Sequence, residues 1–332
     1  MPILEEHHDR SHPVESEGAW SESYYFNCYD PVVDTGFFSR IGIRPNEGTI
    51  DASMSVWLPS GDVAHLRAER PQHEMIDTHL EVGPIAYDCL SPMREWRLTG
   101  QGSAIVQRIG AGAAAQLGDG ATTDIDIDVT FHALTPAIGV DGQGSDKQGA
   151  ASVTSASVGK GHLEQAGRWT GTVTVDGVVH ALGEARGNRD KSWGPRKWGG
   201  PTMWRWFSIN IGDDVAFGGI RIDTALGNLH RGWVWRDGAA TSVAEWQVRT
   251  ELDDDELTQR VVHLTALDKA GRSHELRGDL LRVAPLARLG EGGGTLVNEG
   301  LTRWTYEGRT GTGIAEYLHQ IGSDGRPVTP IE

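Results

Sequence analysis

The two halves of this 332-residue chain resemble each other, and this internal repeat constrains the fold more than any other feature. Three pairs of segments recur in the same order at a spacing of 178 or 179 residues. They are FFSRIGIR at 37–44 with FGGIRI at 217–222, VWLPSG at 56–61 with VWRDG at 234–238, and REWRLTG at 94–100 with RSHELRG at 272–278. The alignment places Phe38 on Phe217 and Gly100 on Gly278.

A fourth pair, YYFN at 24–27 with RWFS at 205–208, fits the scheme if the intervening turn has lost two residues in the second half. Each copy is far longer than the unit of a solenoid. The sequence therefore predicts a duplicated unit with a joint near residue 183, which gives an N-terminal domain over 1–183 and a C-terminal domain over 184–332.

Both halves carry the period-two alternation of half-buried strands. In MWRWFSINI at 203–211, two tryptophans share a face with Ser208 and Asn210, and TDIDIDVTF at 123–131 alternates throughout. Asp176-Gly177 and Asp237-Gly238 are two-residue hairpin signals between such runs. Helical periodicity of useful length is scarce. The predicted fold is all-β, with two tandem antiparallel β-barrels.

Charge and composition exclude several classes of function. The net charge of −16 disfavours nucleic acids and anionic membranes as partners. There is no signal-peptide core and no apolar run of the length that spans a membrane, so we expect a soluble cytoplasmic protein without membrane insertion. In that compartment Cys28 and Cys89 are expected to be free thiols rather than a disulfide.

The segment GNRDKSWGPRKWGG at 187–200 interleaves charges with tryptophans. As a strand, it would place Arg189, Lys191 and Trp193 on one face and Asp190 on the other. A carboxyl group that faces aromatic walls loses hydration, which favours its protonated form and suits a general acid. Alternatively, Asp190 forms a structural ion pair with Arg189 or Arg196.

Motifs for metals and cofactors are absent from the sequence. There is no HExxH, CxxC pair, P-loop, GxGxxG or GxSxG, so we expect neither a metal nor a cofactor. Two further acids are candidates, because Glu164 in GHLEQ and Glu316 in GIAEY lie in similar short strands near the end of each half. An equivalent position in both copies is also consistent with a structural role.

The pattern G-x-R-D-x-S-W-G-x-R at 187–196, with E-Q upstream and G-x-x-E-Y downstream, resembles the carotenoid 1,2-hydratase (hydroxyneurosporene synthase) superfamily of tandem lipocalin-like proteins. The resemblance extends from residue 20 to residue 318. It implies two lipocalin-like barrels with an apolar ligand at or near their junction. Relatives of this fold include hydratases of isoprenoid alkenes, pericyclic cyclases of polyketides and lipid-handling proteins.

Together, the residues and the resemblance predict a cofactor-independent hydratase (hydro-lyase) that acts on an alkene of a small terpenoid or lipid-like substrate. Asp190 is the predicted acid, and Glu164 or Glu316 would orient water. A non-catalytic carrier of an apolar ligand, and an isomerase or cyclase that uses the same acid, are the alternatives. The predicted substrate-binding residues are Trp193, Trp204, Trp206, Tyr25, Asn27, Arg189 and Arg196.

Overall fold

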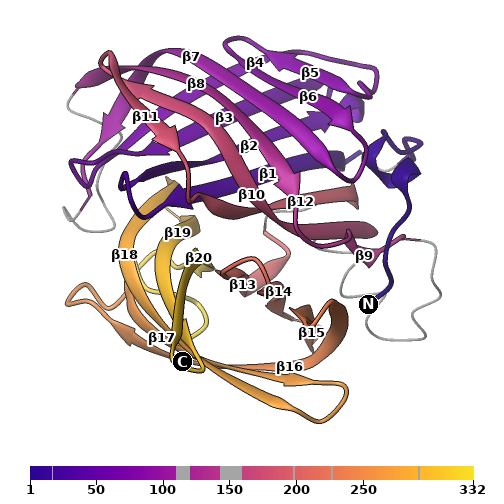
Figure 1. The fold of residues 1–332 in the computed structure, drawn as a ribbon, viewed down its shortest axis with the longest axis vertical. Helices are drawn as coiled ribbons and strands as arrows, with labels where there is room; N and C mark the ends of the chain where they lie inside the picture. Colours follow the sequence, from indigo (N-terminus) through magenta and orange to yellow (C-terminus); the bar gives the residue numbers. More distant parts are fainter. Residues whose placement is uncertain (17, 110–119, 143–158, 197–198, 226, 291) are drawn as a thin grey trace.

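The chain forms two stacked parts made almost entirely of β-strands, as the computed structural model shows (Figure 1). The structure describes residues 1–332 except 17, 110–119, 143–158, 197–198, 226 and 291. Its helices are two short 3₁₀ turns, η1 (Glu6–Asp9) and η2 (Pro45–Glu47). Within these described ranges, no helix has the length and apolar character needed to cross a membrane.

The first part is an antiparallel sheet that closes on itself. Because β8 pairs with both β7 and β10, the pairings form a ring through β10, β12, β1, β2, β3, β4, β7 and β8. Strands β5, β6, β9 and β11 extend this ring at its margins. The strands are β1 (Trp20–Asp30), β2 (Thr35–Arg44), β3 (Thr49–Trp57), β4 (Val63–Pro71), β5 (His79–Val82), β6 (Ile85–Ser91), β7 (Glu95–Gln107), β8 (Thr122–Ala133), β9 (Ile138–Val140), β10 (Gly161–Val175), β11 (Val178–Leu182) and β12 (Arg186–Pro195).

The second part is a closed antiparallel barrel in which the strands pair in chain order. The predicted all-β fold of two antiparallel barrels is therefore confirmed. The strands are β13 (Pro201–Ile211), β14 (Val215–Thr224), β15 (Gly227–Arg236), β16 (Ala239–Leu252), β17 (Gln259–Asp268), β18 (Ser273–Gly290), β19 (Gly293–Tyr306) and β20 (Arg309–Ile321).

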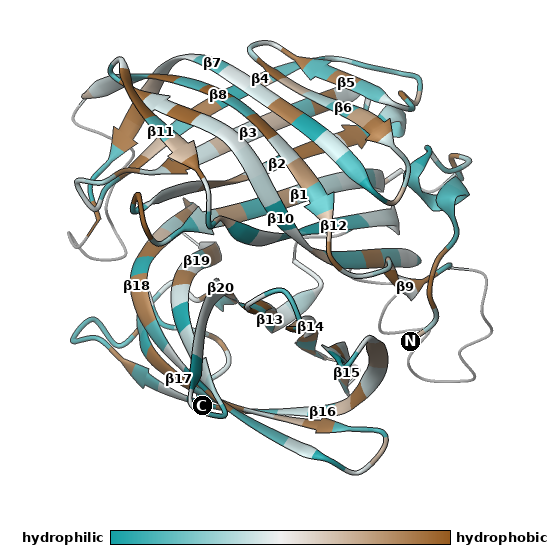
Figure 2. Ribbon diagram, viewed as in Figure 1, coloured by the Kyte–Doolittle hydropathy of each residue, from teal (hydrophilic) through white to brown (hydrophobic). Residues whose placement is uncertain are grey.

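Alternating hydropathy decides which face of each strand fills a barrel (Figure 2). On β8, Ile125, Ile127 and Val129 are buried in the first core, whereas the intervening aspartates are exposed to solvent. The sharp turns also follow the sequence. Asp176 and Gly177 have φ values of 49° and 81°, the left-handed conformation that a type I′ hairpin requires.

The duplication is real, but two of the sequence matches are corrected by strand pairing. Phe37 faces the first core and pairs with Val56, just as Phe217 faces the second core and pairs with Val234. Phe38 instead packs at the junction between the barrels. The partner of Phe217 is thus Phe37, because a slip of one residue moves a side chain to the opposite face of the sheet.

The match of Gly100 with Gly278 fails for a different reason. Gly100 lies in β7, which is the ring neighbour of β4, whereas Gly278 lies in β18, which is one strand further round the second barrel. The two glycines therefore occupy non-equivalent strands. The match of 24–27 with 205–208 agrees with the pairing, since Tyr25 and Trp206 occupy the same place in the first strand of each barrel.

Strand β12 belongs to the first sheet, where it lies between β10 and β1. Strand pairing therefore divides the two barrels between Pro195 and Pro201, later in the chain than the expected joint at 183. Cys28 and Cys89 are free thiols, as predicted.

Candidate active site

A cavity of about 990 Å³ lies at the junction of the two barrels. One wall is the outer face of the first sheet, where a row of side chains opposite one another on neighbouring strands crosses the cavity. We call it the first cross-strand row; its members, in order across the sheet, are Glu164, Asp190, Tyr25, Arg40, Ser53 and Arg67.

The second barrel supplies an equivalent row on the opposite wall of the cavity. Its position in the strand order matches that of the first, so Glu299 corresponds to Glu164, Glu316 to Asp190 and Trp206 to Tyr25. The members of this second cross-strand row are Glu299, Glu316, Trp206, Ile220 and Arg231.

Reciprocal hydrogen bonds join the two rows. The phenol of Tyr25 donates to Glu299 at 3.2 Å, and the indole N–H of Trp206 donates to Glu164 at 2.6 Å. The two rings meet edge to face at 5.4 Å. Tyr25 and Trp206 occupy equivalent positions, and each donates a hydrogen bond to a glutamate of the other barrel. These two bonds fix the barrels against each other around the cavity.

The first acid cluster consists of His162, Glu164 and Asp190. His162 Nε2 lies 2.5 Å from Asp190 Oδ2 and 3.7 Å from Glu164 Oε1. The side chains of His162 and Asp190 are 27% and 18% exposed, whereas that of Glu164 is 1% exposed. The His162–Asp190 pair is therefore the part of the cluster that a molecule in the cavity can touch.

Burial controls the protonation of this cluster. Burial raises the pKa of Glu164 to about 7, against the lowering effect of His162. Burial lowers the pKa of His162, but the charges of Asp190 and Glu164 more than offset it, and the net shift is upward. His162 and Glu164 therefore both bind a proton more tightly than exposed side chains of the same kind.

The same three side chains are a possible metal-ligand set, since one donor atom from each lies within 4.8 Å of the others. Both oxygens of Glu164 already accept indole N–H groups, from Trp206 at 2.6 Å and from Trp233 at 2.8 Å. Ligation of an ion by Glu164 would compete with these bonds. The arrangement fits proton transfer better than metal binding.

The second acid cluster is the pair Glu299 and Glu316, which are hydrogen-bonded to each other. Trp204 Nε1 donates to Glu316 Oε1 at 2.5 Å. Burial raises the pKa of both carboxyl groups, and the negative charge of Glu316 raises that of Glu299 further. Two buried carboxyl groups in contact cannot both ionise readily, so this pair shares a proton.

The structure brings most of the predicted site residues together around the cavity. Seven of them line it: Asp190, Glu164, Glu316, Trp204, Trp206, Tyr25 and Arg196. Burial, together with the positive charge of Arg40, lowers the pKa of Arg196 to about 10. The guanidinium of Arg196 lies 6.0 Å from the ring of Trp204, so a cation and an indole meet at this wall.

Arg189, Trp193 and Asn27 lie outside the lining of the cavity. Strand β12 alternates as expected, so Asp190 faces the cavity while Arg189 and Trp193 face away from it. Asn27 is buried in the junction, where its side-chain oxygen accepts the N–H of Asn188 at 3.2 Å. The predicted ion pair of Asp190 with Arg189 is wrong, because Arg189 pairs with Asp9.

Sequence reasoning missed His162 and Glu299. His162 precedes Glu164 by two residues in an alternating strand, so the face of Glu164 could have indicated it. Glu299 required the correct alignment of the copies, in which the counterpart of Glu164 is Glu299 and not Glu316.

We expect Trp193→Ala to lower the free energy of unfolding by about 3–5 kcal/mol without changing ligand affinity. Trp193 is buried, and its ring stacks on His12 at 3.8 Å. Urea denaturation measures the cost, and Trp235→Ala, at a half-buried indole, is the control with a smaller expected loss. Unchanged stability with lost ligand binding would instead place Trp193 in the binding wall.

A second prediction follows from the pKa of Glu164. Because this pKa is about 7 in the folded chain and ordinarily 4.5, the folded state binds more protons and stability falls as pH rises through this window. Between pH 5 and 8 the free energy of unfolding of the wild type should fall by about 2–3 kcal/mol more than that of Glu164→Gln. Urea denaturation at both pH values measures this difference, with Glu95→Gln as an exposed control. Equal pH slopes for wild type and Glu164→Gln would contradict it.

Comparison with known proteins identifies the family. The family described as "Domain of unknown function (DUF7064)" matches residues 5–321. The chain belongs to this family. No curated protein matches it in sequence. Membership of the DUF7064 family assigns no reaction, and the resemblance to the carotenoid 1,2-hydratase superfamily stays a prediction.

Solved structures resemble the chain over most of its length. A proposed AttH protein from Nitrosomonas europaea is 14% identical with a TM-score of 0.58, and the match covers 90% of this chain and 92% of that one. CghA with Sch210972 is 15% identical with a TM-score of 0.57 over 92% and 89%. Kievitone hydratase from Nectria haematococca is 13% identical with a TM-score of 0.57 over 91% and 90%. At these identities the likeness concerns the fold.

Proposed function

We propose that this protein is a cofactor-independent hydratase (hydro-lyase) that adds water to an alkene of a terpene or other isoprenoid. The observation that carries the proposal is the partly exposed His162–Asp190 pair in a 990 Å³ cavity whose walls include Trp204 and Trp206. The likeness in fold to a protein named kievitone hydratase supports it. The resemblance of residues 187–196 to the carotenoid 1,2-hydratase superfamily supports it as well.

The proposed reaction needs one acid, one cation-stabilising wall and one water molecule. The proton shared by Asp190 and His162 passes to one alkene carbon, and the positive charge develops on the other, more substituted carbon. The indoles of Trp204 and Trp206 face this charge, and each contributes about 0.5–2 kcal/mol of cation–π stabilisation. Water adds to the cation, and the proton that it loses returns to the Asp190–His162 pair.

The carboxylates fix the geometry of this wall. Glu164 holds the N–H of Trp206, and Glu316 holds the N–H of Trp204, so neither ring is free to turn. Glu316 is partly exposed at the cavity wall, so it can orient the attacking water. The protein contributes only side chains to this reaction. The overall reaction is alkene plus water giving an alcohol.

Incubation of the purified protein with acyclic and cyclic terpenes in ¹⁸O-labelled water tests the proposal. We expect an alcohol that carries the label, formed only with the folded protein. An isomerised or cyclised hydrocarbon without label would replace the hydratase with an isomerase or cyclase. Tight binding of terpenes with no product would replace it with a carrier of apolar ligands.

A further inference from the structure

The first cross-strand row changes its charge along its length, from acids at one end to an arginine at the other. Asp190, Tyr25, Arg40, Ser53 and Arg67 lie opposite one another in register on β12, β1, β2, β3 and β4. Arg67 is therefore four strand spacings from Asp190, on the order of 19 Å along the sheet. Both side chains line the same cavity, so one elongated molecule can contact both.

A second arginine reaches the same end of the cavity from the other barrel. Arg288 on β18 lines the cavity and, like Arg67, is exposed to it. Burial and then the positive charge of Arg288 lower the pKa of Arg67, so the two guanidinium groups repel each other. In the described part of the chain, neither side chain has an ion-pair or hydrogen-bond partner. A bound anion would relieve this repulsion.

The charged side chains at this end of the cavity have a small net positive charge. Asp51 accepts a hydrogen bond from Arg40 at 2.8 Å and also pairs with Arg44. Glu69 lines the cavity two residues after Arg67 and accepts from Thr49 at 3.1 Å. Arg67 and Arg288 against Glu69 give a net charge of one positive unit, which matches a monoanion better than a phosphate dianion.

Apolar side chains continue from this end toward the centre of the cavity. Leu286 and Val297, which pair with each other between Arg288 and Glu299, line it. An anion bound here would therefore carry a hydrocarbon chain along the cavity. The planar guanidinium group suits a carboxylate because it donates two parallel hydrogen bonds.

We propose that Arg67 and Arg288 bind the carboxylate of an elongated, apolar carboxylic acid and orient its chain toward the acid end of the first cross-strand row. The substrate class of the protein is then an unsaturated acid whose alkene lies next to Asp190. Only the placing of the alkene rests on the proposed function. Binding of the carboxylate by Arg67 and Arg288 does not depend on the proposed reaction.

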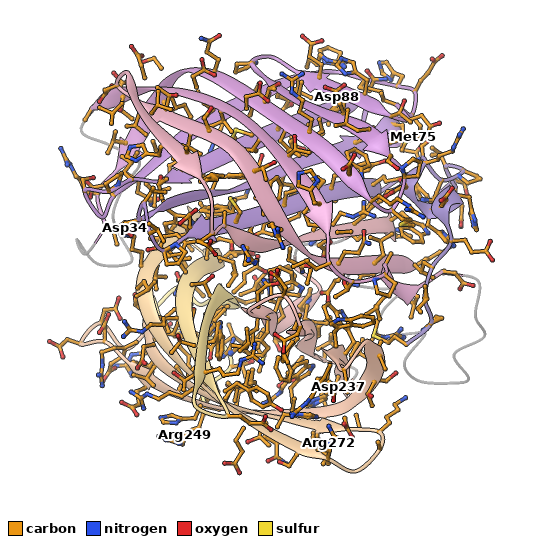
Figure 3. The ribbon with its side chains drawn as sticks, in the orientation of Figure 1. Asp34, Met75, Asp88, Asp237, Arg249 and Arg272 are labelled. Atoms are coloured by element: carbon orange, nitrogen blue, oxygen red, sulfur yellow. The ribbon has the colours of Figure 1, made fainter. Side chains whose placement is uncertain are left out.

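Calorimetric titration with oleate and methyl oleate at low salt tests the subsite. We expect oleate to bind about ten- to hundredfold more tightly than its methyl ester, the usual effect of a charged hydrogen-bond partner. The double variant Arg67→Gln/Arg288→Gln should bind both equally while keeping the wild-type affinity for the ester. The charge-matched control is Arg249→Gln/Arg272→Gln, at exposed arginines on the side of the second barrel remote from the junction (Figure 3), which should keep the preference.

Three results would overturn the proposal: equal affinity of the wild type for oleate and its ester, a preference that survives in the Arg67/Arg288 variant, or tighter binding of oleyl phosphate than of oleate. The outcome is separable from that of the proposed hydratase. A clear preference for oleate with no incorporation of ¹⁸O would retain the subsite and reject the hydratase. Hydration of neutral terpenes without a preference for oleate would retain the hydratase and reject the subsite.

Discussion

We expect Asp190→Asn to lower the rate of hydration by about 10²–10⁴-fold, the usual contribution of general acid catalysis. Asparagine keeps the shape of the side chain but cannot donate a proton to an alkene carbon. The indole walls are untouched, so the affinity for an apolar ligand should stay at the wild-type value. Steady-state kinetics with an ¹⁸O readout, together with ligand titration, separates the two effects.

The chain offers a matched control for this variant. Asp88 forms an aspartate–histidine pair with His79 at 2.5 Å, the same separation as between Asp190 and His162. It lies on the far side of the first barrel from the junction (Figure 3), where His79 is largely exposed and Asp88 is partly exposed. Asp88→Asn therefore removes a pair of the same kind outside the cavity, and it should leave both the rate and the affinity unchanged.

The pH dependence adds an independent readout. Burial lowers the pKa of His162, but Asp190 and Glu164 raise it by more, so the net shift of this pKa is upward. The wild-type rate should decline on the alkaline side, and this decline should vanish in Asp190→Asn. A folded Asp190→Asn protein that hydrates at nearly the wild-type rate would move the acid to Glu164 or to the Glu299–Glu316 pair. Glu164→Gln and Glu316→Gln then decide between them.

Local alternation was a reliable guide because it depends on neighbouring residues alone. It predicted the two faces of β12 and the alternation of β8, just as the Asp-Gly dipeptide predicted the hairpin at Asp176-Gly177, and the structure confirms each. The shared face of Trp204 and Trp206 also places both indoles at the cavity. These features depend on the pleat of a strand and on the conformations that a turn requires.

Features that depend on long-range register could not be read in the same way. The doublet Phe37-Phe38 satisfies two alignments that differ by one residue, and only the partner strand shows which ring enters the core. Glu164 and Glu316 looked equivalent because their local sequences are similar. Their positions in the two rows differ, since Glu164 lies in β10, the strand before the last of the first ring, whereas Glu316 lies in β20, the last strand of the second. His162 and Glu299 became visible only with that pairing.

The inward face of β12 explains the charges that the sequence interleaves with tryptophan. Arg189 is buried under the N-terminal segment, where it donates to Asp9 from Nη1 at 2.5 Å and from Nη2 at 3.2 Å. Its Nε donates to Gln165 at 2.5 Å. Burial raises the pKa of Asp9, but the charge of Arg189 lowers it by more, and the carboxyl group stays ionised. The buried pair attaches the N-terminal segment to the strand that carries Asp190.

We expect Asp9→Ala to lower the free energy of unfolding by about 3–5 kcal/mol, because it leaves a buried guanidinium group without a counter-ion. Asp77→Ala is the control, since Asp77 pairs with Arg10 at 3.8 Å on the surface, and such a pair contributes about 1 kcal/mol or less. The double variant Asp9→Ala/Arg189→Met should regain part of the loss by removing the unpaired charge. Urea denaturation of the four proteins measures these differences. If Asp9→Ala costs no more than Asp77→Ala, then Gln165 and water satisfy Arg189, and the N-terminal segment is not held by this pair.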